Sequence, residues 1–82
     1  MDIKVLGPGC AKCEKLYDEA RKAVEQSGTD ATLIKVDKLD DIIAYGVMIT
    51  PALVIDDVVR STGKVPGADE IAGWLREAAA EK

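Results

Sequence analysis

Residues 50–61 read TPALVIDDVVRS, and this stretch decides the fold. After the Thr-Pro pair, ALVID (52–56) is a nearly continuous apolar run, the pattern of a strand that is buried on both faces. DVVRS (57–61) follows with only the Asp-Asp pair at the junction, so the two segments predict an antiparallel β-hairpin. Asp-Asp is a poorer turn than Asp-Gly, which leaves the register of the hairpin open.

The residues before this hairpin predict two strand–helix units. DIKVLG (2–7) is a short apolar run that Gly-Pro-Gly ends, which indicates a strand followed by a turn. Apolar residues then recur at the 3-and-4 spacing of a helix until Gly28, at Leu16, Tyr17, Ala20, Ala23 and Val24. ATLIKVD (31–37) has the β-branched content of a second strand.

Two more helices complete the predicted order. A short helix through Leu39, Ile42 and Ile43 has Asp37 as its expected N-cap and ends at Gly46. ADEIAGWLREAAAEK (68–82) predicts a last helix, with acidic residues in its first turn. The order is therefore βαβαββα, an α/β fold. We expect a four-stranded mixed sheet with helices on both faces, because a helical crossover makes the first two strands parallel.

The size and charge of the chain limit the classes of function. The 82 residues suit a single domain, 1–82, that folds on an apolar core, since 48% of them are hydrophobic. No run of eighteen apolar residues predicts a membrane span, and MDIKVLG (1–7) does not resemble a signal peptide. The net charge of −4 argues against nucleic acid or a membrane surface as a partner. We expect a cytoplasmic monomer.

Both cysteines lie in GPGCAKC (7–13), between the first strand and the first helix. Two thiols at this spacing can hold a metal, form a structural bridge, or exchange electrons through a disulfide. Cytoplasmic thiols are kept reduced, which favours a catalytic or metal-binding pair over a crosslink. At a helix start, unpaired N–H groups favour the thiolate of Cys10, while Cys13 lies nearer the core.

The Cys-x-x-Cys motif, together with YGVMITPALVI (45–55) ahead of the hairpin and the last helix, resembles the thioredoxin fold. More narrowly, the chain is similar to the small glutaredoxin-like redox-active disulfide proteins of anaerobic bacteria and archaea. This resemblance implies a thiol-disulfide oxidoreductase that needs no metal or other cofactor. Its partners would be protein disulfide substrates and a dithiol or disulfide reductase.

The resemblance also implies the roles of the site residues. Cys10 would be the nucleophile and Cys13 the resolving thiol. Pro51 would follow a cis peptide bond and face the disulfide, and Thr50 would offer its backbone to an extended substrate segment.

The chain departs from the thioredoxin pattern at several positions. Gly9 precedes the first cysteine where thioredoxin has tryptophan, and Ala-Lys replaces Gly-Pro between the cysteines. Lys4 occupies the place of a buried acid that accepts a proton from the resolving thiol. The proton of Cys13 would then go to solvent, to a neutral Lys4, or to a group of the partner. The glycine pair with which glutaredoxins hold glutathione is absent at its usual spacing.

A metal carrier is the alternative from another class. GPGCAKC (7–13) also resembles the loop with which small heavy-metal-binding domains hold Cu(I) or mercury between two thiolates. Those domains have the order βαββαβ, which differs from the order predicted here. Zinc would need two further ligands, and the chain contains no histidine.

Overall fold

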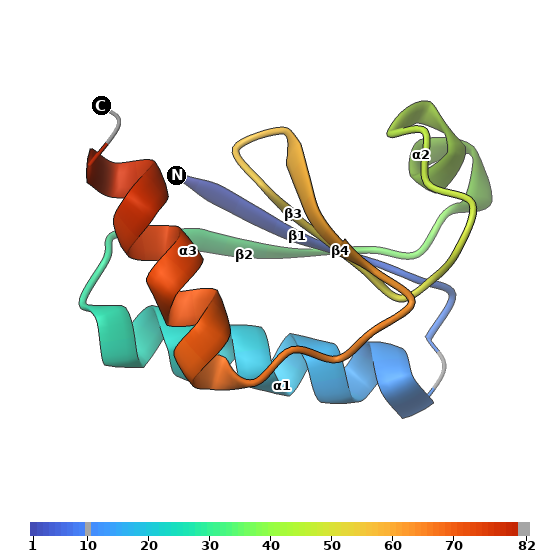
Figure 1. Ribbon diagram of the computed structural model, residues 1–82. Coiled ribbons are helices and arrows are strands. Elements are labelled where there is room, and N and C mark those ends of the chain that lie inside the picture. The colour runs from blue at the N-terminus through green and yellow to red at the C-terminus, as the bar shows by residue number, and fades with distance from the viewer. Residues whose placement is uncertain (10, 81–82) are drawn as a thin grey trace.

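The computed structural model describes residues 1–9 and 11–80. Its elements follow the predicted order βαβαββα (Figure 1). Their bounds are β1 (Asp2–Leu6), α1 (Ala11–Ser27), β2 (Thr32–Val36), α2 (Leu39–Ala44), β3 (Ala52–Ile55), β4 (Val58–Thr62) and α3 (Ala68–Ala80).

The strands form one mixed sheet in the order β2-β1-β3-β4. β1 pairs in parallel with β2, as expected for two strands that are joined through a helix. β1 also pairs antiparallel with β3, and β3 pairs antiparallel with β4. The predicted four-stranded mixed sheet is therefore confirmed, with β1 and β3 at its centre.

The larger core lies between the sheet and the two long helices. Figure 1 shows α1 and α3 together on one side of the sheet. Side chains alternate between the two faces along a strand, so every second residue of β1 and β3 points toward these helices. The large buried side chains of this core are Ile3, Val5, Leu16, Leu53, Ile55, Ile71 and Leu75.

A smaller core lies on the opposite face, under α2. There, Leu6 of β1 and Val54 of β3 pack with Ile42 of α2 and with Val47, which follows α2. Figure 1 shows α2 at one end of the sheet, away from α1 and α3. Helices therefore lie on both faces, as predicted, although α2 has only six residues.

The turn of the hairpin has a conformation that its two aspartates rarely adopt. Asp56 and Asp57 have φ values of 48° and 66°. Positive φ at both central residues is the requirement of a type I′ turn, whose twist matches that of paired strands. Asp56 accepts a hydrogen bond from the backbone N–H of Asp2 at 2.9 Å and returns one from its own N–H to the Asp2 carbonyl at 2.9 Å. These bonds between the turn and β1 support the conformation.

The N-cap predicted for the short helix is wrong. Lys38, and not Asp37, is the N-cap residue of α2, and no side chain caps the helix there. A lysine side chain has no acceptor atom, so it cannot bond the unpaired N–H groups of the first turn. At the other end of the chain, the predicted last helix is observed from Ala68 to Ala80, and the expectation for its final two residues lies outside the described residues.

Candidate active site

Cys13 lies in the first turn of α1 and is 1% exposed. It belongs to the buried stripe of the helix, which continues through Leu16, Ala20 and Ala23. The prediction that Cys13 lies near the core is confirmed. Cys10 lies outside the described residues, so its expected exposure and its role stay predictions.

Gly7 packs directly against the sulfur of Cys13. A Cβ atom built on Gly7 would lie 2.2 Å from Sγ and 3.1 Å from Cβ of Cys13. The backbone at Gly7 is held in place, because its N–H donates to the carbonyl of Val36 at 2.9 Å. Only a residue without a side chain leaves room for this sulfur. The sequence indicated Gly7 as part of a turn and contained no sign of this contact.

Pro51, which directly precedes β3, lies at the same site. The Thr50–Pro51 peptide bond is cis, as the resemblance implies. Pro51 is fully buried, and its Cα lies 3.9 Å from the Cβ position built on Gly7. The tertiary structure therefore brings Cys13, Gly7 and Pro51 together from α1, the end of β1 and the start of β3.

Gly63 supports Pro51 from the end of β4. Its backbone N–H donates to the Pro51 carbonyl at 2.7 Å. Gly63 has a φ of 69°, and a Cβ built on it would lie 2.7 Å from Cγ2 of Ile49. This second glycine was also missed from the sequence, because its contacts come from the segment before Pro51.

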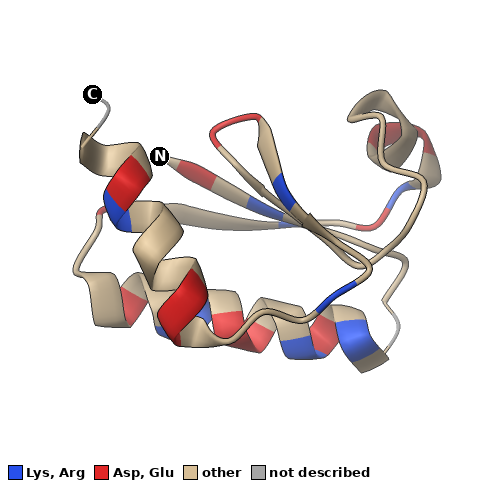
Figure 2. Cartoon of the chain, in the orientation of Figure 1, with Lys and Arg blue, Asp and Glu red and all other residues tan. Residues whose placement is uncertain are grey.

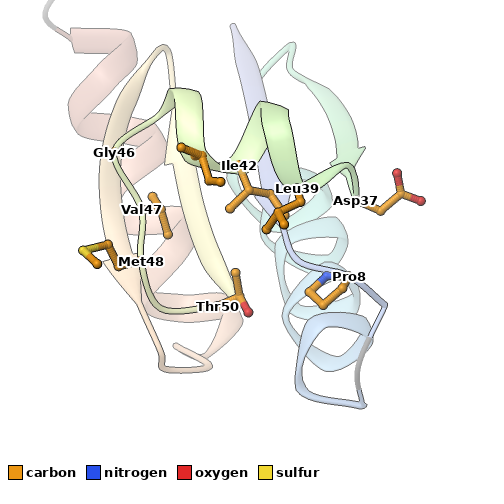
Figure 3. A pocket seen from close by; sticks show the side chains of 9 residues that line it. Pro8, Asp37, Leu39, Ile42, Gly46, Val47, Met48 and Thr50 are labelled. Atoms are coloured by element: carbon orange, nitrogen blue, oxygen red, sulfur yellow. The ribbon is translucent and has the colours of Figure 1, made fainter.

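An apolar groove of about 640 Å³ begins beside these residues (Figure 3). Pro8, from the loop before Cys10, and Thr50, next to Pro51, are both part of its wall. The other lining residues are Asp37, Leu39, Ile42, Ile43, Gly46, Val47 and Met48. The groove therefore extends from the neighbourhood of Cys13, Gly7 and Pro51, called here the thiol site, to α2 and to the segment that follows α2.

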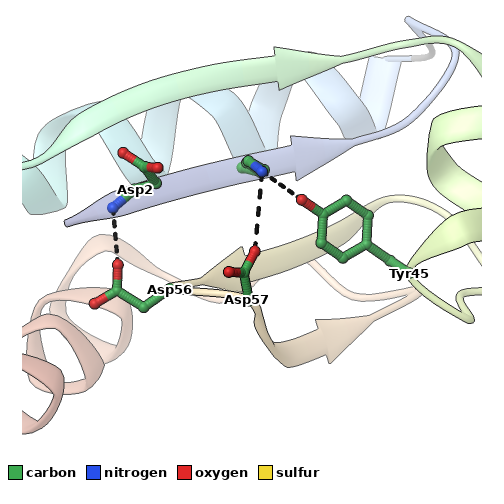
Figure 4. A network of polar contacts seen from close by, with 5 residues as sticks. Asp2, Tyr45, Asp56 and Asp57 are labelled. Atoms are coloured by element: carbon green, nitrogen blue, oxygen red, sulfur yellow. Dashed lines mark hydrogen bonds and ion pairs between the residues drawn. The ribbon is translucent and has the colours of Figure 1, made fainter.

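Lys4 contacts Tyr45 and Asp57 in a polar network on the opposite face of the sheet, and Figure 4 labels these two partners. It alternates with Ile3 and Val5, whose side chains point toward α1, so its own side chain points away from α1. Its ammonium group donates a hydrogen bond to the Tyr45 hydroxyl and lies 4.0 Å from Oδ1 of Asp57.

This environment keeps Lys4 charged. The hydrogen bond to Tyr45 raises the pKa of Lys4 above its ordinary value, and the charge of Asp57 acts in the same direction. A neutral Lys4 as the proton acceptor for Cys13 is therefore disfavoured by its charge state and by the face on which it lies. Solvent or a group of the partner are the remaining routes.

The observed order of elements argues against the heavy-metal alternative. A heavy-metal domain of the type considered has the order βαββαβ, whereas the described residues of this chain have the order βαβαββα.

The fold, the buried thiol in the first turn of α1 and the cis-proline define a thioredoxin-like protein. A family model described as the thioredoxin domain matches residues 1–76. The chain belongs to the thioredoxin family, and hence to the thiol-disulfide oxidoreductases.

Two curated relatives support this membership. A protein named thioredoxin from Methanocaldococcus jannaschii is 41% identical over 74 residues, which cover 90% of this chain and 85% of the relative. A second thioredoxin, from Methanothermobacter thermautotrophicus, is 37% identical over 71 residues, which cover 87% of this chain and 92% of the relative. Among the described residues, no helix has the length and apolar character that a membrane span requires.

Proposed function

We propose that this chain reduces disulfide bonds in other proteins with the thiols of Cys10 and Cys13. The observation that carries the proposal is the burial of the Cys13 sulfur in the first turn of α1, against Gly7 and near the cis-proline Pro51. A resolving thiol is expected in such a place, close to the first cysteine and shielded from other oxidants. Membership of the thioredoxin family supports the same chemistry.

The reaction has two exchange steps. The thiolate of Cys10 attacks one sulfur of the substrate disulfide, which forms a mixed disulfide and releases the other substrate sulfur as a thiolate. That thiolate takes a proton from solvent. Cys13 gives its proton to solvent or to a group of the partner, and its thiolate then attacks the sulfur of Cys10. This breaks the mixed disulfide and releases the second substrate sulfur as a thiolate, which takes a proton from solvent. Two electrons pass to the substrate, and Cys10 and Cys13 end as a disulfide.

The cycle closes when a dithiol or disulfide reductase returns two electrons to this disulfide. We place the reaction in the cytoplasm, where thiols are kept reduced, and we propose that the chain acts as a single-domain monomer. Thr50 is the proposed contact for the substrate backbone, because it lines the groove immediately before Pro51. Pro51 has no N–H group, so Thr50 supplies the backbone groups at this point.

Trapping of the mixed disulfide tests the assignment of the two cysteines. Cys13→Ser lacks the resolving thiol, so it should accumulate a covalent adduct with a peptide disulfide, detected by mass spectrometry under non-reducing conditions. Cys10→Ser should accumulate almost none. Equal trapping by both variants, or trapping by Cys10→Ser alone, would show that the roles are assigned wrongly.

A further inference from the structure

The groove beside the thiol site exposes large apolar side chains. Leu39 is 69% exposed, Ile43 is 60% exposed and Met48 is 97% exposed, and all three line the groove. A contiguous exposed apolar surface of this kind marks a binding site more often than a chance feature of the surface. The wall of the groove thus favours an apolar side chain from a partner.

The groove lies within reach of a substrate segment that is bound at the thiols. In Figure 3, Thr50 and Pro8 lie on two sides of the lower end of the groove, and Leu39 and Ile42 of α2 lie above them. Pro8 is two residues from Cys10 in the chain, and Thr50 precedes Pro51. An extended segment advances about 3.3 Å per residue, so a substrate whose cysteine reaches the thiols places residues one to three positions away in this groove.

The groove carries a negative charge at its edge. Asp37 is the one charged residue among those that line it within the described part of the chain. Its carboxylate makes no hydrogen bond or ion pair with residues 1–9 or 11–80, and it does not cap α2. Figure 2 shows further acidic residues on α2, and residues 37–41 contain three aspartates and one lysine.

We propose that the groove selects substrate segments with a large apolar residue within three positions of the reactive cysteine and an arginine or lysine that pairs with Asp37. The apolar residue covers Leu39, Ile43 and Met48, and the cationic residue complements the unpaired carboxylate. This inference rests on the proposed function and adds to it the chemical class of the substrate.

Four peptide disulfides of one length test the two requirements separately. They combine leucine or alanine at the apolar position with arginine or glutamate at the charged position. The wild type should reduce the leucine–arginine peptide most efficiently. We expect a preference for leucine of about tenfold in kcat/KM. We expect a preference for arginine of roughly two- to fivefold that weakens at high salt.

Two variants and one matched control locate the selection. Asp37→Asn should abolish the preference for arginine over glutamate and keep the preference for leucine. Ile43→Ser should weaken the preference for leucine. Asp30→Asn, also an exposed aspartate but before β2 instead of after it, should change neither preference. Unchanged arginine preference in Asp37→Asn, or its loss in Asp30→Asn as well, would overturn the proposal.

The remaining outcomes separate this inference from the proposed function. If the wild type reduces hydroxyethyl disulfide but all four peptides equally, the inference is wrong and the proposed function stands. If it reduces no disulfide at all, both are wrong. A wild-type dimer in analytical ultracentrifugation that Ile43→Ser disperses would show that a second copy of the chain covers the groove, and would also overturn the inference.

Discussion

Gly7→Ala places a methyl group where the sulfur of Cys13 lies. The new Cβ would be 2.2 Å from Sγ, which is 0.8 Å inside the 3.0 Å limit that real Cβ contacts respect (3.0 minus 2.2). Rotation of the sulfur away from the new methyl group is opposed by close packing, because Cys13 is 1% exposed. Gly7 itself cannot retreat without loss of its hydrogen bond to Val36.

This conflict should make Gly7→Ala one of the more costly alanine substitutions in the chain. Overpacking of a tight site costs about 1–3 kcal/mol, and we expect about 3 kcal/mol because both partners are held by the backbone. For a domain of this size each kcal/mol lowers Tm by roughly 4–8 °C, so the expected fall is about 12–24 °C. The backbone of Gly7 does not need a positive φ, so the cost comes from the contact alone.

A double-mutant cycle with Cys13→Ala isolates that contact. Without Sγ, the nearest atom to the new methyl group is the Cβ at 3.1 Å, a distance that small shifts can relieve. In the Cys13→Ala background, the cost of Gly7→Ala should fall below about 1 kcal/mol, which gives a coupling energy of about 2 kcal/mol. Urea unfolding of the four reduced proteins measures these free energies.

Gly73→Ala is the control for the general effect of a glycine substitution. A Cβ built on Gly73 meets no atom within 4 Å, and Gly73 lies inside α3. Alanine is the better helix former, so this variant should gain about 0.5–1 kcal/mol. If Gly7→Ala costs the same with and without the Cys13 sulfur, the packing of Gly7 against the thiol is not the reason for the glycine.

Three further predictions concern the larger core, the hydrogen bond from Gly63 to Pro51, and the contacts of Lys4. Leu75→Ala should cost about 2–5 kcal/mol in urea unfolding, because Leu75 is fully buried in the larger core and its loss leaves a cavity. Gly63→Ala should cost about 1–2 kcal/mol in the same measurement, because its φ of 69° disfavours a side chain, whereas the close Ile49 is 61% exposed and can move aside. Lys4→Met should lower the free energy of unfolding at pH 7, since Lys4 loses its bond to Tyr45. Because the pKa of Lys4 is raised by folding, its contribution is fully present below the ordinary value of 10.5 and is lost as pH rises through the higher pKa of the folded protein. The difference from wild type should therefore shrink in unfolding curves recorded at higher pH.

The order of the elements could be read from the sequence because local patterns determine it. The 3-and-4 spacing from Leu16 to Val24 predicted α1 and its buried stripe, and the nearly continuous apolar run 52–56 predicted a strand buried on both faces. The same spacing placed Cys13 near the core, since it shares a helix face with Leu16 and Ala20. Residues within one helix or strand have their relative orientation set by the backbone period, whatever the rest of the chain does.

The tertiary structure alone decided the features that depend on residues far apart in the chain. Asp56 and Asp57 form a tight turn with the support of Asp2, which is 54 positions from Asp56. Lys4 is held by Tyr45, 41 positions away, which neither strand nor helix periodicity could indicate.

The candidate site shows the same division. The sequence marked Cys13 and Pro51 by their motifs, but the need for glycine at position 7 arises only where α1, the end of β1 and the start of β3 meet. A side chain there is excluded by the volume of the Cys13 sulfur, and local conformational preference carries no information about that volume. Close packing between segments distant in sequence is therefore what distinguishes Gly7 from an ordinary turn glycine.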